Sequence, residues 1–360
     1  MRVPRALGGL PGFATAMIGV ETVRRENADR DAVRVRQWHY TEAPRELELV
    51  PGSDPVPALG GVRTTVSLLD VEDRRYSLRN GYLVDPALRI VYEEELAAGF
   101  PFRRMALSRL ETPRPVDGVV ACLRQEDNYG HWLLLALPLI EYYREVLGRD
   151  PDYYYLGPVV RPWLYEALER LGIPASMTLT DAVTADRLLV AIADREEGYD
   201  RHFLLYPDEQ LTAGAARPST GRRVFVSRAT AAHRRLLNEA ECIEALSQAF
   251  GVEPVATEKL SLEDEIALFQ ETELIVGAHG AGMINCVFSP AGAALVELAS
   301  DTYWFPQAAQ LTAVKNQRFA LVTGSSTGLR VGIPALKHDF VVDVDHLLRV
   351  VGAAVAGDTG

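Results

Sequence analysis

The stretch Leu274-Ile275-Val276-Gly277-Ala278-His279-Gly280-Ala281-Gly282 indicates the fold class of this chain. A short apolar strand runs into a glycine-rich turn, and a helix to about residue 288 follows. Glycines at such a turn let the backbone approach a ligand, and the N–H groups that start a helix favour an anion such as a diphosphate. The spacing G-x-x-G-x-G differs from the G-x-G-x-x-G of dinucleotide folds, and the chain has no G-x-x-x-x-G-K-[ST]. The stretch predicts an anion-binding strand–turn–helix unit, with a tight turn that binds nothing as the alternative.

Strands and helices alternate on both sides of this turn. The hydrophobic pattern predicts strands at 116–123, 152–156, 187–192, 223–226, 252–256, 274–276 and 294–298. It predicts helices at 131–147, 163–171, 238–250, 261–269 and 344–351. In the third of these helices, Asn238 and Glu241 have the spacing of a capping box. Alternation of this kind builds parallel sheets covered by helices on both faces, so we predict an α/β protein made of two halves.

Changes in composition suggest where the parts of the chain begin and end. Residues 1–62 are rich in Arg, Pro and Gly and have weak periodicity, while short alternating runs at 63–95 predict a small β-meander. We therefore expect residues 1–110 to form an irregular lead-in and a β-rich extension packed on a first half at 111–206. Residues 207–221 are expected to be a linker, because Pro, Gly, Ser and Thr are concentrated there. A second half follows at 222–340, and a C-terminal helix and tail at 341–360.

The overall charge excludes some classes of partner. The 360 residues, enough for about two domains, have a formal net charge of −12. Such a chain is a poor partner for nucleic acid or anionic lipid, so we expect no nucleic-acid binding and at most peripheral membrane contact. The three cysteines, Cys122, Cys242 and Cys286, are widely spaced among apolar neighbours. They predict buried thiols rather than disulfides or a zinc site.

The N-terminus has the faint outline of a signal peptide. Arg2 and Arg5 precede a partly apolar stretch at 6–20, but three glycines and Pro11 interrupt it. We therefore expect a cytoplasmic protein.

Basic and polar residues follow two of the predicted strands. Arg228 comes just after strand 223–226, at the edge where α/β sheets bind ligands, and a guanidinium suits phosphate oxygens. His233, Arg234 and Arg235 complete a basic cluster, with a solvated loop as the alternative for the last two.

A second polar group follows strand 116–123 and begins a helix. Asp127-Asn128-Tyr129-Gly130-His131-Trp132 combines carboxylate, amide and imidazole, which can bind sugar hydroxyls and provide a general base. A helix cap at Asn128 and a half-buried His131 without a function are the alternative.

Acidic residues at two further places in the sequence could take part in the chemistry. Glu297, near the end of strand 294–298, has the place of an acidic residue that accepts hydrogen bonds from a ribose, or of a strand-end charge facing solvent. Asp343-Val344-Asp345 has the D-x-D form of a metal site, but it precedes the last helix and is better explained as a helix cap. We therefore expect no metal and no other cofactor.

Taken in chain order, these motifs resemble glycosyltransferase family 61. The resemblance covers residues ~115–300 and rests on Asn128-Tyr129-x-His131-Trp132 with Leu137-Pro138, Ser227-Arg228, Asn238-Glu239, Gly277-x-His279-Gly280-Ala281-Gly282 and Glu297-Leu298. Gly130 stands where an aromatic residue is frequent, and Met283 where Leu is usual. The resemblance implies a GT-B-like fold, with two Rossmann-like lobes facing a cleft, and an inverting, metal-independent single displacement. It also implies a nucleotide-sugar donor, expected to be a UDP-sugar, and a glycan or small-molecule hydroxyl acceptor, as in polysaccharide biosynthesis.

The resemblance also implies roles for individual residues. His131 would deprotonate the acceptor, with Asp127 in reserve. Arg228 and His279, with the helix start at Gly280, Ala281 and Gly282, would bind the donor diphosphate. Glu297 and Ser227 would bind its ribose or base. Asn128, Trp132, Asn238 and Glu239 are expected to bind the acceptor or to be structural. A nucleotide- or glycan-binding module without turnover is the alternative function, whereas a dehydrogenase would need the missing G-x-G-x-x-G.

Overall fold

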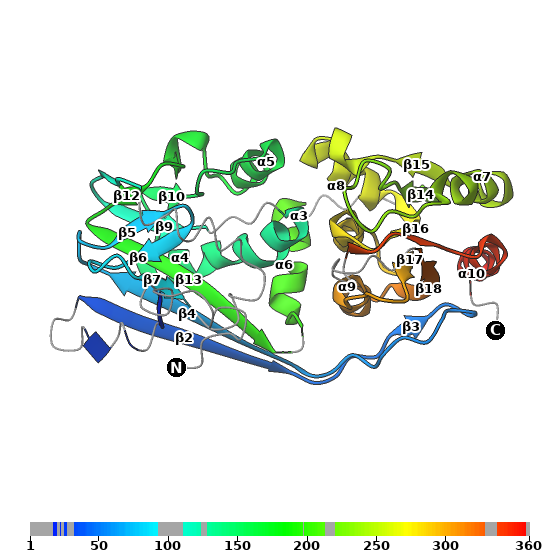
Figure 1. Cartoon of the computed structure of the whole chain (residues 1–360), viewed down its shortest axis with the longest axis horizontal. Helices are drawn as coiled ribbons and strands as arrows, with labels where there is room; N and C mark the ends of the chain where they lie inside the picture. Colours follow the sequence, from blue (N-terminus) through cyan, green and yellow to red (C-terminus); the bar gives the residue numbers. More distant parts are fainter. Residues whose placement is uncertain are drawn as a thin grey trace. The chain divides into compact units, whose positions relative to one another are not determined.

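The chain folds into two compact units. Each contains both strands and helices, which confirms the predicted α/β class. The computed structural model describes residues 17–19, 22, 25–26, 32–92, 111–123, 128–196, 198–212, 220–327 and 337–357. Unit 1 consists of Met1–Tyr40 and Arg63–Glu196, and unit 2 of Thr41–Val62 and Glu197–Gly360. Figure 1 labels their elements. The division falls at 196/197 rather than in the expected linker, and residues 41–62 belong with the C-terminal unit.

A six-stranded sheet forms the centre of unit 1. Its order is β11-β10-β9-β13-β4-β2. The strands β9, β10, β11 and β13 are parallel, and β4 is antiparallel to β13. Their bounds are β2 Val33–Glu42, β4 Val62–Val71, β9 Val119–Cys122, β10 Tyr153–Tyr155, β11 Thr178–Leu179 and β13 Arg187–Glu196. The ten-residue strand β2 shows that residues 1–62 are not all irregular.

A second, mostly short-stranded sheet packs on the first within unit 1. Its order is β1-β7-β6-β5-β12-β8, with bounds β1 Met17–Gly19, β5 Ser77–Arg79, β6 Tyr82–Val84, β7 Ile90–Tyr92, β8 Arg114–Pro115 and β12 Val183–Thr184. The predicted meander is confirmed for β5, β6 and β7, whose first turn is Asn80-Gly81 in the left-handed conformation typical of two-residue hairpins. The expectation that β4 belongs to this meander is wrong. Its apolar side chains pair and pack with β13, which is distant in sequence.

The helices of unit 1 include the segment that contains His131. They are α3 Tyr129–His131, the π-helical turn η2 Trp132–Ala136, α4 Leu139–Leu147, α5 Pro162–Arg170 and the 3-10 turn η3 Ala175–Met177. Helix α4 ends at Gly148, which has the left-handed conformation expected of a terminating glycine. The buried Tyr143 fixes α4 to the sheet, because its hydroxyl donates to the Cys122 carbonyl at 2.5 Å and accepts from the Ala191 N–H at 2.9 Å.

Unit 2 contains a parallel sheet in the order β15-β14-β16-β17-β18, extended by the antiparallel β19 and by β3 at β18. The bounds are β3 Glu48–Leu49, β14 Arg222–Val226, β15 Glu253–Val255, β16 Thr272–Ala278, β17 Ala294–Ser300, β18 Arg318–Ser326 and β19 Phe340–Val341. Its helices are α6 Arg201–Leu211, α7 Glu239–Phe250, η4 Thr257–Lys259, α8 Leu262–Gln270, η5 Ala281–Phe288, α9 Gln307–Lys315 and α10 Val344–Ala356.

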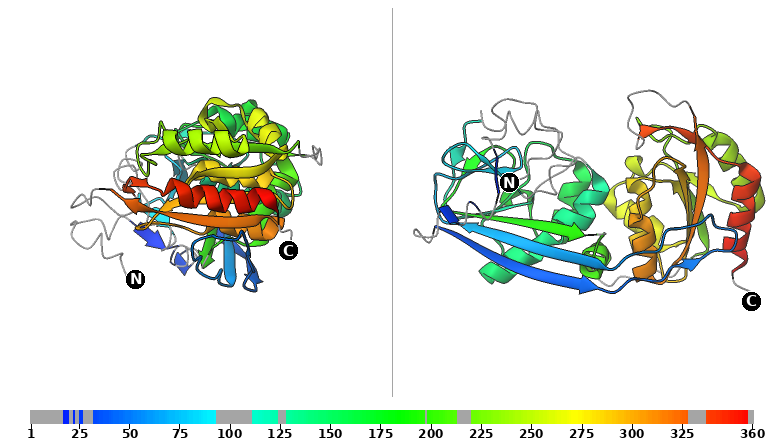
Figure 2. Two further views of the ribbon diagram at one scale, coloured as in Figure 1. Left: turned by 90° about the vertical axis from the view of Figure 1, so that its right-hand side faces the viewer. Right: turned by 60° about the horizontal axis from the view of Figure 1, so that its bottom comes forward.

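The helices of unit 2 cover both faces of its sheet. Figure 2 shows α7 and α10 on one face and α8 and α9 on the other. The first pair shares a buried core with the central strands, including Leu246, Val276, Val296, Ala320 and Val350. Among the described residues, no helix has the length and apolar character needed to cross a membrane.

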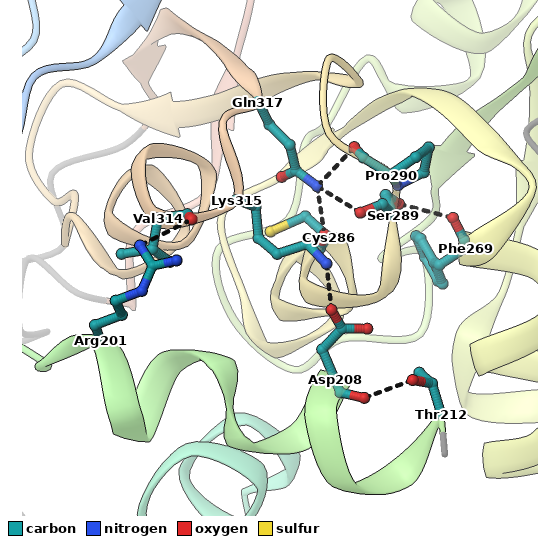
Figure 3. Close-up of polar contacts among 10 residues, drawn as sticks. All are labelled: Arg201, Asp208, Thr212, Phe269, Cys286, Ser289, Pro290, Val314, Lys315 and Gln317. Atoms are coloured by element: carbon teal, nitrogen blue, oxygen red, sulfur yellow. Dashed lines mark hydrogen bonds and ion pairs between the residues drawn. The ribbon is translucent and has the colours of Figure 1, made fainter. Parts of the chain in front are cut away.

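Helix α6 overturns part of the predicted linker. Pro207 lies inside the helix rather than ending it, and the side chain of Asp200 caps the helix start by accepting from the Phe203 N–H at 3.2 Å. Figure 3 shows α6 joined to α9 by an ion pair between Asp208 and Lys315. Residues 207–211 are therefore helical, and residues 213–219 of the expected linker lie outside the described residues.

One local prediction in unit 2, the capping box at Asn238, was also wrong. The Asn238 side chain makes no capping bond to α7, because it pairs instead with the Val342 backbone, donating at 2.9 Å and accepting at 3.2 Å. The helix predicted after the glycine-rich turn is confirmed, and it is the 3-10 helix η5. The prediction of buried thiols is confirmed for all three cysteines.

We predict that Tyr143→Phe destabilises unit 1. The change removes the hydroxyl that satisfies two buried backbone groups, and an unsatisfied buried group costs about 1–3 kcal/mol. Urea unfolding followed by tryptophan fluorescence measures the loss. Tyr142→Phe is the matched control, because its hydroxyl donates to another side-chain hydroxyl, that of the half-buried Tyr40, at 2.9 Å; a loss equal to that of Tyr143→Phe would contradict the prediction.

Candidate active site

Each unit brings polar residues to the edge where its strand order reverses. In unit 2 the chain passes from β14 outward to β15 and then returns to the other side of β14 to form β16. In unit 1, β9 has β10 on one side and β13 on the other. Parallel sheets bind ligands at the carboxyl ends of strands that flank such a reversal. These edges hold Arg228 and His279 in unit 2 and the Asn128–His131 segment in unit 1.

Arg228 and Gly280 are in close contact in unit 2. The strand register pairs Val226 with Gly277, so the residues that follow the two strands lie side by side. A Cβ atom at position 280 would lie 2.7 Å from the Arg228 Cζ atom. A side chain at 280 would therefore displace the guanidinium that packs against this glycine. Gly277 and Gly282 also have a packing role. A Cβ atom at 277 would lie 2.8 Å from the Met283 sulfur, and one at 282 would lie 3.0 Å from Val226.

The backbone that presents Arg228 is held by the largely buried Glu239 at the start of α7. One Glu239 carboxylate oxygen accepts from the Ser227 hydroxyl at 2.5 Å, and the other accepts from the Arg228 N–H at 3.1 Å. The Arg228 Nη2 atom donates to the His233 carbonyl at 3.3 Å. These contacts give Ser227 and Glu239 a structural part in shaping the loop.

The Arg228 guanidinium is a desolvated cation. Burial, followed by the nearby positive charge of Arg234, lowers the pKa of Arg228 to about 10. Its buried Nε atom has no hydrogen-bond partner among the residues described. Buried polar groups in proteins are nearly always satisfied, so this guanidinium has hydrogen-bonding capacity that the described residues do not use.

Arg234 and Tyr303 extend this positive region. Arg234 has a φ of 55°, a left-handed conformation uncommon for a residue with a side chain, and its guanidinium lies 5.5 Å from the Tyr303 ring centroid. His279 also contacts Tyr303, and the centroids of the two rings lie 5.5 Å apart. Tyr303 therefore connects two of the basic groups at this edge.

His279 is oriented by the fully buried Glu297. The Nδ1 atom of His279 lies 2.9 Å from one carboxylate oxygen of Glu297, and the Trp304 indole donates to the other at 2.8 Å. With Glu297 ionised, Nδ1 carries the proton and Nε2 is the ring atom left for a ligand. The alternative of a Glu297 side chain facing solvent is thus wrong, and the protein itself already occupies both of its oxygens.

The unit 1 residues form a helix start. The Asn128 side chain accepts from the His131 N–H at 3.2 Å, which is the N-cap role weighed for it. His131 is half-buried, and the buried Trp132 packs edge-on against Trp163 with ring centroids 5.9 Å apart. Asp127 lies outside the described residues.

Two residues of this edge, Tyr303 and Trp304, were not among the predicted site residues. They follow β17, so their place after a strand of the same sheet as Arg228 and His279 is the sequence signal that points to them. The cap interpretation of Asp343 is confirmed, because its side chain accepts from the His346 N–H at 2.8 Å. Within the described part of the chain, no cluster of three or more His, Cys, Asp or Glu side chains could hold a metal ion.

The chain resembles known glycosyltransferases. Residues 129–296 match the family model described as Glycosyltransferase 61. The chain is 33% identical over 99 residues to protein O-linked-mannose beta-1,4-N-acetylglucosaminyltransferase 2 of Bos taurus, covering 27% of this chain and 17% of the relative. It is 31% identical over 98 residues to EGF domain-specific O-linked N-acetylglucosamine transferase of Drosophila melanogaster, covering 26% and 19%. Each match therefore spans less than a fifth of the relative's length.

We predict that Gly280→Ala weakens nucleoside diphosphate binding without unfolding unit 2. The added methyl group displaces the flexible end of Arg228, which folding tolerates but an anion contact does not. Loss of one charge-assisted hydrogen bond, about 1.5–3 kcal/mol, corresponds to about 10- to 100-fold in Kd. Calorimetric titration with UDP, GDP, CDP and dTDP measures the change. Gly352→Ala, within helix α10, is the control that should bind as the unmodified protein does; equal affinity in both variants would contradict the assignment.

Proposed function

We propose that this chain, whose residues 129–296 belong to glycosyltransferase family 61, transfers a sugar from a nucleotide-sugar donor to a hydroxyl acceptor. The observation that carries the proposal is the desolvated Arg228 guanidinium packed on Gly280 beside the Glu297-oriented His279. The names of both relatives specify transfer of N-acetylglucosamine. UDP-N-acetylglucosamine is therefore the first donor to test, and a glycan is the expected class of acceptor.

In this proposal unit 2 binds the donor. The diphosphate lies on Arg228, His279 and the N–H groups that start η5, which supply the positive potential that stabilises a departing phosphate. Arg234 is close enough to Arg228 to add to that potential. We propose that these groups stabilise the leaving group without a metal ion. Because Glu297 is committed to His279 and Trp304, we assign it to positioning His279 rather than to direct ribose binding.

Unit 1 supplies the acceptor side of a GT-B enzyme in this proposal. His131 accepts the proton of the acceptor hydroxyl as its oxygen forms a bond to the anomeric carbon. The bond from that carbon to the phosphate oxygen breaks on the opposite face, and the nucleoside diphosphate leaves with the bonding electrons. The single displacement inverts the configuration at the anomeric carbon, through an oxocarbenium-like transition state of the kind known from glycoside chemistry.

The experiment that tests the proposal is a thermal shift of the purified chain against UDP-, GDP-, CDP- and dTDP-sugars, each with and without EDTA. A ligand present at 100 times its Kd stabilises by about 2.7 kcal/mol, which moves Tm by several degrees. A selective shift that EDTA leaves unchanged and Arg228→Ala abolishes supports the donor site. A shift that requires a metal contradicts metal independence, and the absence of any shift contradicts the donor site. Binding without transfer to any glycan acceptor would favour the non-catalytic module.

We predict that His131→Ala abolishes transfer and spares donor binding. A general base contributes about 10²–10⁴-fold to a rate, so kcat should fall by that factor while the Kd for the nucleotide stays the same. Donor turnover with a glycoside acceptor measures kcat, and NMR of the product gives its anomeric configuration. His39→Ala is the matched control in unit 1, because His39 is an exposed histidine on strand β2. An unchanged kcat in His131→Ala would remove His131 from the mechanism.

A further inference from the structure

The helical segment that contains the proposed base, His131, has one turn that is wider than an α-helical turn. After α3, residues Trp132–Ala136 form a π-helical turn, and the Leu137 N–H donates to the Trp132 carbonyl five residues earlier at 3.0 Å. Regular α-helical geometry resumes in α4 at Leu139. Isolated π turns within helices are rare and occur frequently at functional sites, so this one calls for a physical cause.

Pro138 provides that cause. Proline has no N–H to donate, and in a regular α-helix its ring clashes with the carbonyl four residues earlier, here that of Leu134. A local widening of the helix moves that carbonyl away while the neighbouring N–H, that of Leu137, finds the more distant acceptor. The proline follows the wide turn directly, and its φ of −62° and ψ of −21° let the helix continue beyond it.

The segment after the wide turn is fixed to the sheet of unit 1. On the C-terminal side, Tyr143 ties α4 to β9 and β13 through its two buried hydrogen bonds. On the N-terminal side, Asn128 caps the helix by accepting from the His131 N–H. An α-helix turns by about 100° per residue. Compared with a regular α-helix of the same sequence, the π turn therefore changes the orientation of the preceding residues relative to α4 by about that angle. His131 is the residue immediately before the turn.

We propose that Pro138 is a positioning residue, and that the wide turn it enforces sets the direction of the His131 side chain relative to the sheet of unit 1. The proposal rests on the proposed function, because it gives His131 the role of base. Pro138 itself takes no part in the chemistry. It acts by keeping the turn open, so its effect on the reaction passes entirely through His131.

The test is Pro138→Ala, measured alone and combined with His131→Ala. Without the proline the turn can close toward α-helical geometry, and the base moves away from its working position. Misplacement of a reacting group by about 1 Å costs up to about 100-fold in rate, so we expect kcat to fall by about 10- to 100-fold. The Kd for UDP should not change, since its proposed site is in unit 2. Pro162→Ala, at the first position of α5, is the matched control and should leave kcat unchanged.

The combined variant separates positioning from general damage. If Pro138 acts only through His131, the double variant has the same residual kcat as His131→Ala, because the two changes are fully non-additive. A further loss in the double variant would overturn the proposal, as would an unchanged kcat in Pro138→Ala alongside an inactive His131→Ala. If His131→Ala itself retains full kcat, the proposed function fails at its base, whatever Pro138→Ala does.

A second variant covers the case in which Pro138→Ala does not fold. Deleting the half-buried Leu135 together with Pro138→Ala takes the additional residue out of the turn and allows a continuous α-helix into α4. Circular dichroism and a cooperative melt establish that the variant is folded. Four α-helical residues turn by about the same angle as the five residues of the π turn, so the deletion keeps the direction of His131 relative to α4. A folded deletion variant with unchanged kcat supports the proposal, and one that loses kcat while still binding UDP would overturn it.

Discussion

The contact between the Arg228 guanidinium and the backbone of Gly280 is the constraint on which the site in unit 2 depends. It requires β14 and β16 to be neighbours in parallel register, with Val226 opposite Gly277, so that both strands end at the same level. It also requires a residue without a side chain at 280 and a loop that holds the Arg228 backbone in place. Glu239 meets the last condition from the start of α7. Strand order, glycine placement and a buried carboxylate therefore act together to desolvate one cation.

The carboxylates near the Arg228 guanidinium hold other groups of the site in place and do not bond to the guanidinium itself. Glu239 accepts from a hydroxyl and a backbone N–H, and Glu297 pairs with His279 and an indole, so neither forms a salt bridge to the Arg228 side chain. The nearby charges of Glu239 and Glu258 raise the pKa of Arg228, but burial outweighs them and is the main reason that this pKa is lowered. A direct carboxylate partner would satisfy the guanidinium and compete with an anionic ligand. In a chain of net charge −12, a guanidinium without a carboxylate bonded to its side chain is the main support for the proposed anion site.

The sequence predicted the elements whose signals are local and missed those that depend on distant partners. Strands 223–226 and 294–298, the helix ends at Gly148 and Gly251, and the Asp343 cap are correct because glycine chemistry and apolar runs determine them nearby. Strand β4 could not be assigned to its sheet, since its pairing with β13 joins residues more than a hundred positions apart. Pro207 was interpreted as a break because the packing of α6 on α9 is invisible in a local window. The same distinction holds for the site. Arg228 and His279 are predictable because each follows a strand, whereas the contacts of Tyr303 with His279 and Arg234 join residues distant in sequence and are visible only in the structure.

The two strand-order reversals are chemically different, and that difference is the strongest reason to give the units different substrates. The edge in unit 2 gathers guanidinium groups, an imidazole held by a carboxylate and a helix start, which together suit a phosphate. At the unit 1 edge, residues 128–132 offer an amide, an imidazole and aromatic rings but no Arg or Lys. Groups of that kind suit a neutral, hydroxyl-rich molecule and the removal of one proton from it. The proposed transfer of a phosphate-activated sugar to a hydroxyl would use one edge of each kind.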